Sequence, residues 1–178
     1  MKSLNFGTKI MWRVFGAVAA LAMLVGFVFA PAATAYADDG TAAAPGGGKR
    51  LEAAFKAEQK WLAAQAERLS KANEFSAEAQ KKIDELKAKG KDTSALETAL
   101  ANYQAQIAAA QAAHDNAVSI LGAHAGFDEN GKVTDRSLAK NTVQAAHTAL
   151  AEAHRSLRQA RIDLMKALKD WRNANKTK

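Results

Sequence analysis

The chain contains no cysteine, so neither a disulfide framework nor a thiolate metal site can stabilise it. Both of its prolines lie within the first 45 residues, and from Lys49 onward glycine occurs only at positions 90, 122, 126 and 131. Such long stretches without helix breakers favour helix over strand. We therefore predict an all-α domain that is stabilised by packing, and we exclude the small disulfide-stapled folds of secreted proteins.

The first 37 residues have the pattern of an export signal. An apolar run covers residues 14–30, and Ala35-Tyr36-Ala37 supplies the small residues that a signal peptidase reads. The basic residues before the run are Lys2, Lys9 and Arg13. We predict a signal peptide over 1–37, with an uncleaved N-terminal anchor as the alternative because the run is near the minimum length that spans a bilayer. In both cases the remainder is exported to the periplasm, the cell surface or the extracellular space.

Residues 38–48, DDGTAAAPGGG, have the composition of a flexible linker. The predicted helical domain follows over 49–178. Without the three basic residues of the signal, 22 of the 25 Lys and Arg remain against 18 Asp and Glu, which lowers the net charge from +7 to +4. The exported part is therefore only mildly basic, and its length fits one domain.

Breaks in the apolar periodicity divide this domain into four predicted helices, at about 49–73, 77–89, 94–123 and 135–173. Ser76 is a candidate N-cap for the second helix, and Gly90 stands where a left-handed residue would end it. The third helix opens with capping-box spacing at Ser94 and Glu97, or with a cap at one of the two preceding residues. Asn130-Gly131 suits a turn, after which Thr134 or Asp135 opens the last helix.

The last helix carries a heptad repeat in which alanine alternates with a larger apolar residue. Steps of four and three residues keep one stripe facing a partner helix, and alanine lets that partner approach closely. The stripe consists of Ala139, Val143, Ala146, Leu150, Ala153, Leu157, Ala160, Leu164, Ala167 and Trp171. The third helix has a stripe of the same kind, which consists of Leu96, Leu100, Tyr103, Ile107, Ala110, His114, Ala117 and Leu121. We predict an elongated antiparallel bundle in which these two helices form a coiled-coil hairpin with an alanine-rich seam.

We predict that this hairpin folds about Asn130, which pairs Leu121 with Ala139 and Ala117 with Val143. A slip of one heptad is the alternative, because it also keeps apolar residues opposite one another.

Positive charge gathers in the last third of the chain. From Thr134 onward, ten Lys and Arg face four Asp and Glu. The candidate binding surface on the last helix consists of Arg155, Arg158, Arg161, Lys166, Lys169 and Arg172. Such a surface could bind an acidic polymer or lipid head groups, or could be a solvated surface that faces a protein partner. The basic residues are not interleaved with the series of aromatic residues that a single-strand platform requires, so we expect no specific nucleic-acid binding.

Four histidines are the candidate metal ligands, but their spacing does not bring three of them together. His147 and His154 are seven residues apart, or about 10 Å along one helix, which is too far to share an ion. His114 could approach His147, which gives two ligands at most. We predict no metal site and no cofactor, and keep histidine-based metal binding as a third functional alternative.

The segment from Gly126 to Thr134 has part of the pattern of an EF-hand calcium loop. Asp128 and Asn130 fall at the third and fifth places, but Gly126 and Ser137 stand at the two ends, where the loop requires carboxylates. Losing both end ligands removes most of the anionic coordination. We interpret the segment as a turn between helices.

The sequence predicts no catalytic residues, because no serine, threonine or carboxylate pair accompanies a histidine in a motif and no glycine-rich phosphate loop occurs. We expect an exported, non-catalytic bundle with a structural, protein-interaction or chaperone-like role in the cell envelope or outside the cell. Its partner would be a second copy or another protein, with an acidic polymer or a membrane surface as the alternative. In size, export signal, basicity and helicity the chain resembles small extracytoplasmic helical chaperones of the Spy and CpxP kind. It lacks their Leu-Thr-x-x-Gln motif, so no residue role carries over.

Overall fold

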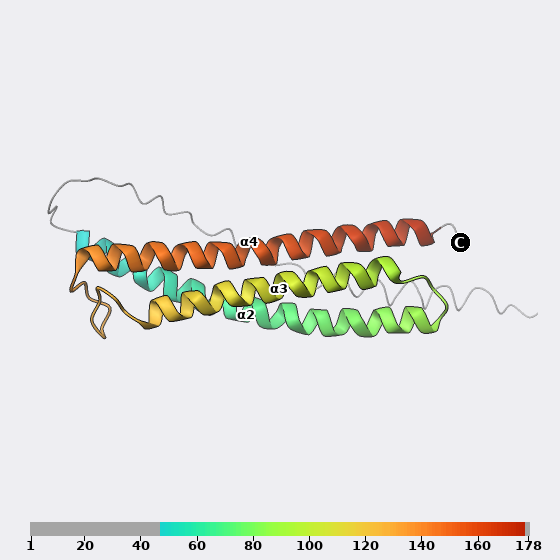
Figure 1. Ribbon diagram of the computed structural model, residues 1–178, viewed down its shortest axis with the longest axis horizontal. Helices are drawn as coiled ribbons and strands as arrows, with labels where there is room; N and C mark the ends of the chain where they lie inside the picture. The colour runs from blue at the N-terminus through green and yellow to red at the C-terminus, as the bar shows by residue number, and fades with distance from the viewer. Residues whose placement is uncertain (1–46, 177–178) are drawn as a thin grey trace, which may run out of the picture. The chain divides into compact units, whose positions relative to one another are not determined.

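The computed structural model describes residues 47–176, which form three α-helices (Figure 1). In chain order these are α2 (Gly47–Ala88), α3 (Ser94–Gly122) and α4 (Arg136–Asn175). Consecutive helices run in opposite directions. Residues 47–176 contain no β-strand, and the loop before α4 has one isolated antiparallel bridge between Phe127 and Val133. The predicted all-α helical bundle is confirmed.

The described helices all belong to one of two units into which the chain divides, Met1–Gly40 and Thr41–Lys178. The predicted signal peptide, 1–37, lies outside the described residues, as does the predicted linker up to residue 46. None of the three described helices carries an apolar stretch long enough to cross a membrane.

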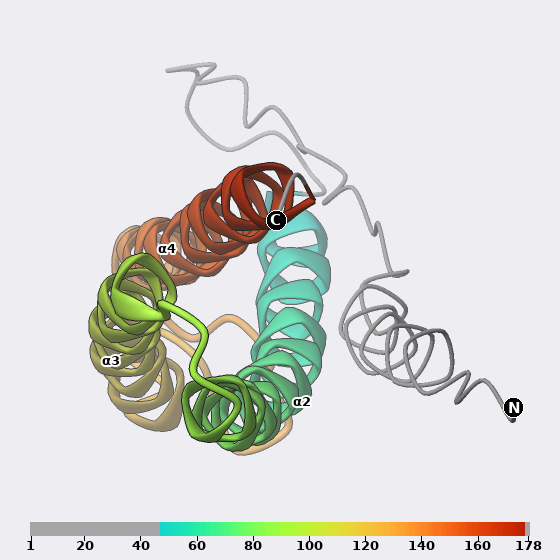
Figure 2. The same cartoon turned by 90° about the vertical axis from the view of Figure 1, so that its right-hand side faces the viewer.

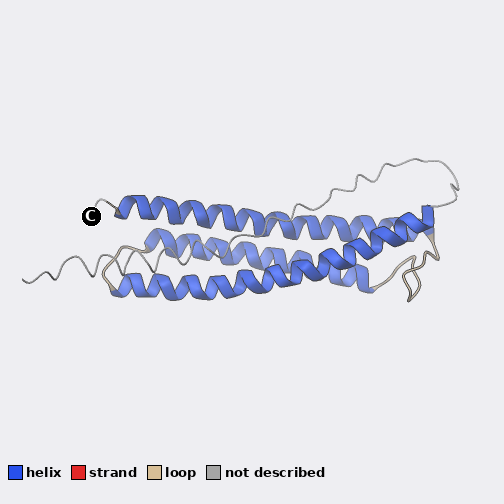
Figure 3. Ribbon diagram, turned by 180° about the vertical axis from the view of Figure 1, so that it is seen from behind, coloured by secondary structure: helices blue, strands red, loops and turns tan. Residues whose placement is uncertain are grey.

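α2 is one continuous helix, so the predicted break between residues 73 and 77 is wrong (Figure 3). Ser76 does not cap a helix; it is buried in the middle of α2, and its Oγ accepts a hydrogen bond from Gln104 Nε2 at 3.0 Å. The reason is that buried and half-buried positions continue through this segment with steps of three and four residues. These positions are Leu69, Ala72, Ser76, Ala79 and Ile83.

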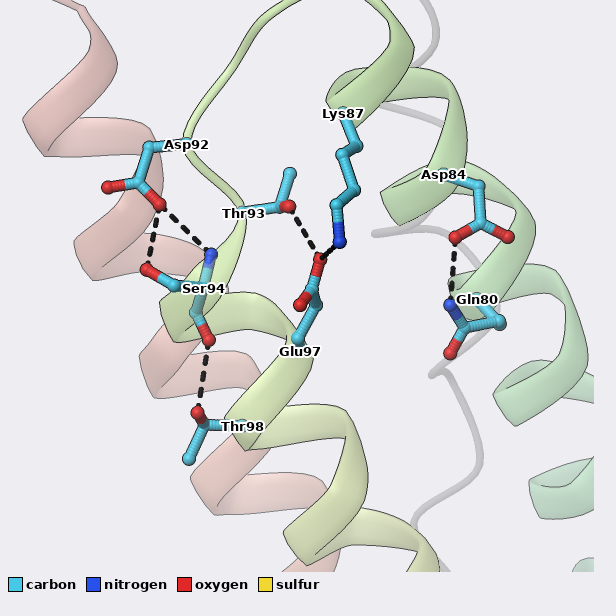
Figure 4. A network of polar contacts seen from close by, with 8 residues as sticks. All are labelled: Gln80, Asp84, Lys87, Asp92, Thr93, Ser94, Glu97 and Thr98. Carbon is cyan, nitrogen blue, oxygen red and sulfur yellow. Dashed lines mark hydrogen bonds and ion pairs between the residues drawn. The ribbon is translucent and has the colours of Figure 1, made fainter.

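The turn between α2 and α3 is held by side chains from both helices (Figure 4). Gly90 has a φ of 72°, the left-handed conformation expected there. The capping box between Ser94 and Glu97 does not form. Instead, Asp92 Oδ1 accepts from the backbone N of Ser94 at 3.0 Å, and Glu97 Oε1 accepts from Thr93 Oγ1 at 2.8 Å and Lys87 Nζ at 2.9 Å. Glu97 thereby links the first turn of α3 to the end of α2.

α3 and α4 share the most extensive interface of the bundle. The buried residues of α3 are the eight of its predicted stripe. Seven of the ten predicted seam residues of α4 are buried, whereas Leu157, Ala167 and Trp171 are half-buried. A helix with 3.6 residues per turn drifts by about 20° per heptad against a seven-residue repeat, so the buried stripe moves off these positions and Leu168 joins it near the end.

The predicted register about Asn130 is wrong, because contacts between these two helices fit the alternative that is slipped by one heptad. Ala117 packs in a buried cluster with Ala149 and Leu150, whereas a fold about Asn130 would pair it with Val143. Likewise, Thr142 Oγ1 donates to the carbonyl of Ala125 at 2.8 Å, although that fold would place it opposite position 118.

The loop before α4 depends on one glycine and one cap. Gly126 has a φ of 83°, and a Cβ at this position would collide with the backbone of Ala139. At the start of α4, Asp135 Oδ1 accepts from the backbone N of Leu138 at 2.9 Å. Of the two predicted alternatives for this cap, Asp135 is the residue that caps the helix.

Candidate functional site: the basic surface of α4 and its junction with α2

The six basic residues predicted as a binding surface lie on two neighbouring stripes of α4, because a helix turns once in 3.6 residues. Arg155, Lys166 and Lys169 share one stripe; Arg158, Arg161 and Arg172 share the other. Five of them are exposed and Arg172 is half-buried. We call these six residues the basic surface of α4.

One of the two stripes lies on the side of α4 that meets α2. Two contacts mark this side: His147 Nδ1 lies 3.1 Å from Glu58 Oε1, and the carbonyl of Leu150 accepts from Gln65 Nε2 at 3.0 Å. Steps of four, four and three residues from Leu150 then lead through position 154 to Arg158 and on to position 161. The α2-facing side of α4 therefore continues into arginines.

α2 does not follow α4 along its whole length. In its second half α2 contacts α3: the rings of Phe75 and Tyr103 are 5.7 Å apart, and Gln104 bonds to Ser76. Both views show α2 crossing from the side of α4 to the far side of α3 (Figures 1 and 2). Arg158 and Arg161 consequently stay exposed although they lie on the α2-facing side.

Where the two helices separate, cations from both act on one imidazole. Arg68 lies one turn beyond Gln65 on α2, and His154 lies one turn beyond Leu150 on α4; both side chains are half-buried. The pKa of His154 is lowered from its ordinary value, first by burial and then by the positive charges of Arg68 and Arg158. The basic surface of α4 thus extends onto α2 at Arg68.

A carboxylate is buried at the neighbouring junction. Glu58 is 4% exposed, its Oε1 faces His147 Nδ1, and its Oε2 has no hydrogen-bond partner among the described residues. Burial raises the pKa of Glu58, while the hydrogen bond and charge of His147 lower it less strongly. The centres of the Trp61 and His147 rings lie 5.4 Å apart.

A second buried polar contact joins all three helices. Gln65 is fully buried, and its Oε1 lies 3.2 Å from His114 Nδ1. Because Gln65 Nε2 donates to the Leu150 carbonyl, Oε1 is the acceptor and Nδ1 of His114 carries the proton. Gln65 and Glu58, two of the buried polar residues of α2, therefore bond to a histidine of α3 and one of α4.

His114 and His147, which were predicted to supply two metal ligands at most, do not share a site. Each histidine bonds to its own residue of α2, Gln65 or Glu58. Within residues 47–176, no three histidine, aspartate or glutamate side chains are arranged to hold a metal ion. His124 stands apart, with its ring 5.4 Å from that of Phe55.

The loop with the partial calcium-binding pattern uses its aspartate to form a turn. Asp128 Oδ1 accepts from the backbone N of Asn130 at 2.9 Å and from that of Lys132 at 2.8 Å. Lys132 Nζ in turn lies 2.9 Å from Glu52 Oε2 and ties the loop to α2. These contacts give Asp128 a structural role in the turn.

Comparison with protein-family models, curated proteins and solved structures gave no significant match to the chain. Sequence reasoning missed Glu58, Gln65 and Arg68 as members of the helix junction. The first two had a detectable signal, because they occupy core positions in the repeat between Phe55 and Leu69, where a polar residue requires a buried partner. Arg68 had none, since only the packing brings it to His154.

Proposed function

We propose that this protein is an exported, non-catalytic helical bundle that binds another protein, with a structural or chaperone-like role in the cell envelope or the extracellular space. The apolar run and Ala35-Tyr36-Ala37 of the sequence support export. The observation that supports binding is the basic surface of α4. It presents five exposed cationic side chains within fifteen residues of one helix, from Arg155 to Lys169.

Charge of one sign on a rigid helix favours association with a partner of the opposite sign. The described polar groups of the interior serve a different purpose, because Glu58 and Gln65 join helices to one another. The exposed side chains of α4 therefore provide the means of contact with a partner.

Affinity capture tests this proposal. The exported chain, tagged at its C-terminus, is used to capture proteins from native envelope and extracellular material. The control is the same chain with Arg155, Arg158, Lys166 and Lys169 changed to Gln. A protein captured by the wild type and lost from the control supports the proposal. Equal capture by both chains, or no protein partner at all, contradicts it. N-terminal sequencing of the exported chain tests cleavage after Ala37.

Binding of an acidic polymer or a membrane surface is the second candidate, and the same basic surface favours it. Release of counterions makes polyanion binding weaken steeply as salt increases. Retention on heparin that falls steeply with salt, with no protein captured, would favour the polymer, whereas capture of a protein that the four-substitution control loses would favour the protein partner.

A further inference from the structure

We infer that Arg68, His154 and Arg158 form a binding site for an acidic peptide segment, located where α2 and α4 separate, and that its affinity increases as the pH falls. The inference rests on the proposed binding of a protein partner. It places the binding site on two helices, specifies an acidic peptide as the part of the partner that binds, and makes the affinity depend on pH.

The first argument is uncompensated positive charge. The contact between Gln65 Nε2 and the Leu150 carbonyl, at 3.0 Å, brings α2 and α4 together one turn before Arg68 and His154. Arg68 and Arg158 come from different helices, and both act on the imidazole of His154. Among the described residues, neither arginine forms an ion pair with a carboxylate. Bringing like charges together costs free energy, and an anionic ligand removes that cost.

The surrounding charged groups do not cancel this charge. On α2, Lys71 follows Arg68 after one turn; on α4, Arg161 follows Arg158 after three residues. Glu152 lies two residues before His154, on the opposite side of the helix. Glu67 precedes Arg68 on a neighbouring stripe.

On α3, the charged or titratable residues nearest this level are His114 and Asp115. His114 is buried against Gln65, and Asp115 Oδ1 accepts from Gln111 Nε2 at 2.7 Å. Neither is therefore positioned as an ion-pair partner for the two arginines.

The second argument identifies a peptide rather than another polyanion. Leu157 is half-buried and lies one turn after His154, beside Arg158, so an apolar surface is included in the charged site. A peptide can cover Leu157 with an apolar side chain, which a sulfated or phosphorylated polymer cannot do. The planar guanidinium groups bind carboxylates through two parallel hydrogen bonds. An acidic segment with apolar residues between its carboxylates matches both features.

Proton linkage follows from the position of His154. In the free protein the pKa of His154 is below its ordinary value of 6.5, first because of burial and then because the two arginines disfavour the imidazolium. A carboxylate bound between them offsets their charge and raises this pKa, so the complex takes up a proton that the free protein lacks. Glutamate carboxylates have an ordinary pKa of about 4.3, so the ligand remains charged while His154 titrates.

The test uses the full exported chain and a fluorescent peptide in which Glu and Leu alternate. Fluorescence anisotropy gives its Kd at about pH 7.5 and about pH 5.5, between which an ordinary histidine titrates. We expect tighter binding at the lower pH. His154→Gln should remove the pH dependence. Arg68→Gln and Arg158→Gln should each weaken binding roughly two- to fivefold, the range of an exposed ion pair. Lys81→Gln, an exposed cation elsewhere on α2, is the matched control.

A second peptide, in which Glu and Ser alternate, has the same charge and should bind more weakly because it cannot cover Leu157. Heparin and vesicles with anionic phospholipids complete the set. Binding of either in preference to the Glu-Leu peptide, or equal effects of Arg68→Gln and Lys81→Gln, overturns the inference. Melting followed by circular dichroism establishes that each variant is folded. If affinity capture succeeds but is unchanged in the Arg68→Gln and Arg158→Gln chain, the proposed function stands and this inference fails.

Discussion

Nδ1 of His114 lies 3.2 Å from Oε1 of Gln65, in the interior shared by the three helices. The same glutamine donates to the carbonyl of Leu150 on α4 at 3.0 Å. One fully buried side chain of α2 is thus bonded to both α3 and α4. The position of α2 depends on polar contacts as well as on apolar burial, since the buried residues Glu58 and Ser76 also bond to side chains of the other two helices.

Gln65→Ala should lower the free energy of unfolding by about 2–4 kcal/mol, because it leaves a cavity and removes the acceptor of a buried N–H donor. Urea unfolding followed by circular dichroism measures the loss. Gln59→Ala, at an exposed position on the same helix, is the control and should have little effect. Similar losses for the two variants would mean that Gln65 contributes no buried contact.

Two leucines of α4, one heptad apart, distinguish the observed packing from a core that follows a strict seven-residue repeat. Leu150 is fully buried, whereas Leu157 is half-buried. Leu150→Ala should cost about 2–5 kcal/mol, and Leu157→Ala about half as much because less apolar surface returns to water. Thermal and urea unfolding of the two variants give the comparison. Equal losses would indicate that the seven-residue repeat remains in the core through Leu157.

The interface between α3 and α4 was the best predicted from the sequence, because the apolar repeat of each helix identifies the side of that helix that is buried. Each residue of the stripe on α3 is buried. Leucine, isoleucine and alanine at steps of three and four lie on one side of a helix, and that side is stable only when it is covered. The end of the α4 stripe departs from prediction because a helix period of 3.6 residues drifts against a repeat of seven. The predicted register was wrong by one heptad, because an apolar pattern that repeats after every heptad fits both registers.

The site was less predictable than the fold because it depends on which helices meet. The six basic residues of α4 could be read from charge alone; five of them are exposed and Arg172 is half-buried. The addition of Arg68 depends on the path of α2, which meets α4 at Gln65 and then crosses to α3 (Figure 2). No spacing within α2 or α4 encodes that contact.

Substitutions at Ser76 test the continuity of α2. At a helix N-cap, glycine is tolerated better than alanine; in a helix interior, glycine is less stable than alanine by about 0.5–1 kcal/mol. We therefore expect Ser76→Gly to be less stable than Ser76→Ala by that amount, with Gln104 losing its acceptor in both variants. Chemical unfolding of the pair decides between the two arrangements, and the reverse order would restore the break between two helices.

The buried carboxylate of Glu58 should make stability depend on pH. Its pKa is raised in the folded state, mainly by burial, so the folded protein holds a proton there more readily than the unfolded chain. The resulting contribution to stability is complete below the unfolded-state pKa and is lost as the pH rises through the folded-state pKa. Glu58→Gln keeps an uncharged side chain at every pH. We therefore expect the variant to gain stability relative to wild type as the pH rises from about 4 to about 8.

Melting temperatures across this range measure the effect, with Glu78→Gln as a control at an exposed position on the same helix. His147→Gln separates the causes, because His147 partly opposes the effect of burial through its hydrogen bond and charge. Removing its charge should raise the pKa of Glu58 further and extend the loss of stability to higher pH. A difference between wild type and Glu58→Gln that stays constant with pH would show that the carboxylate reaches water and is not desolvated against α4.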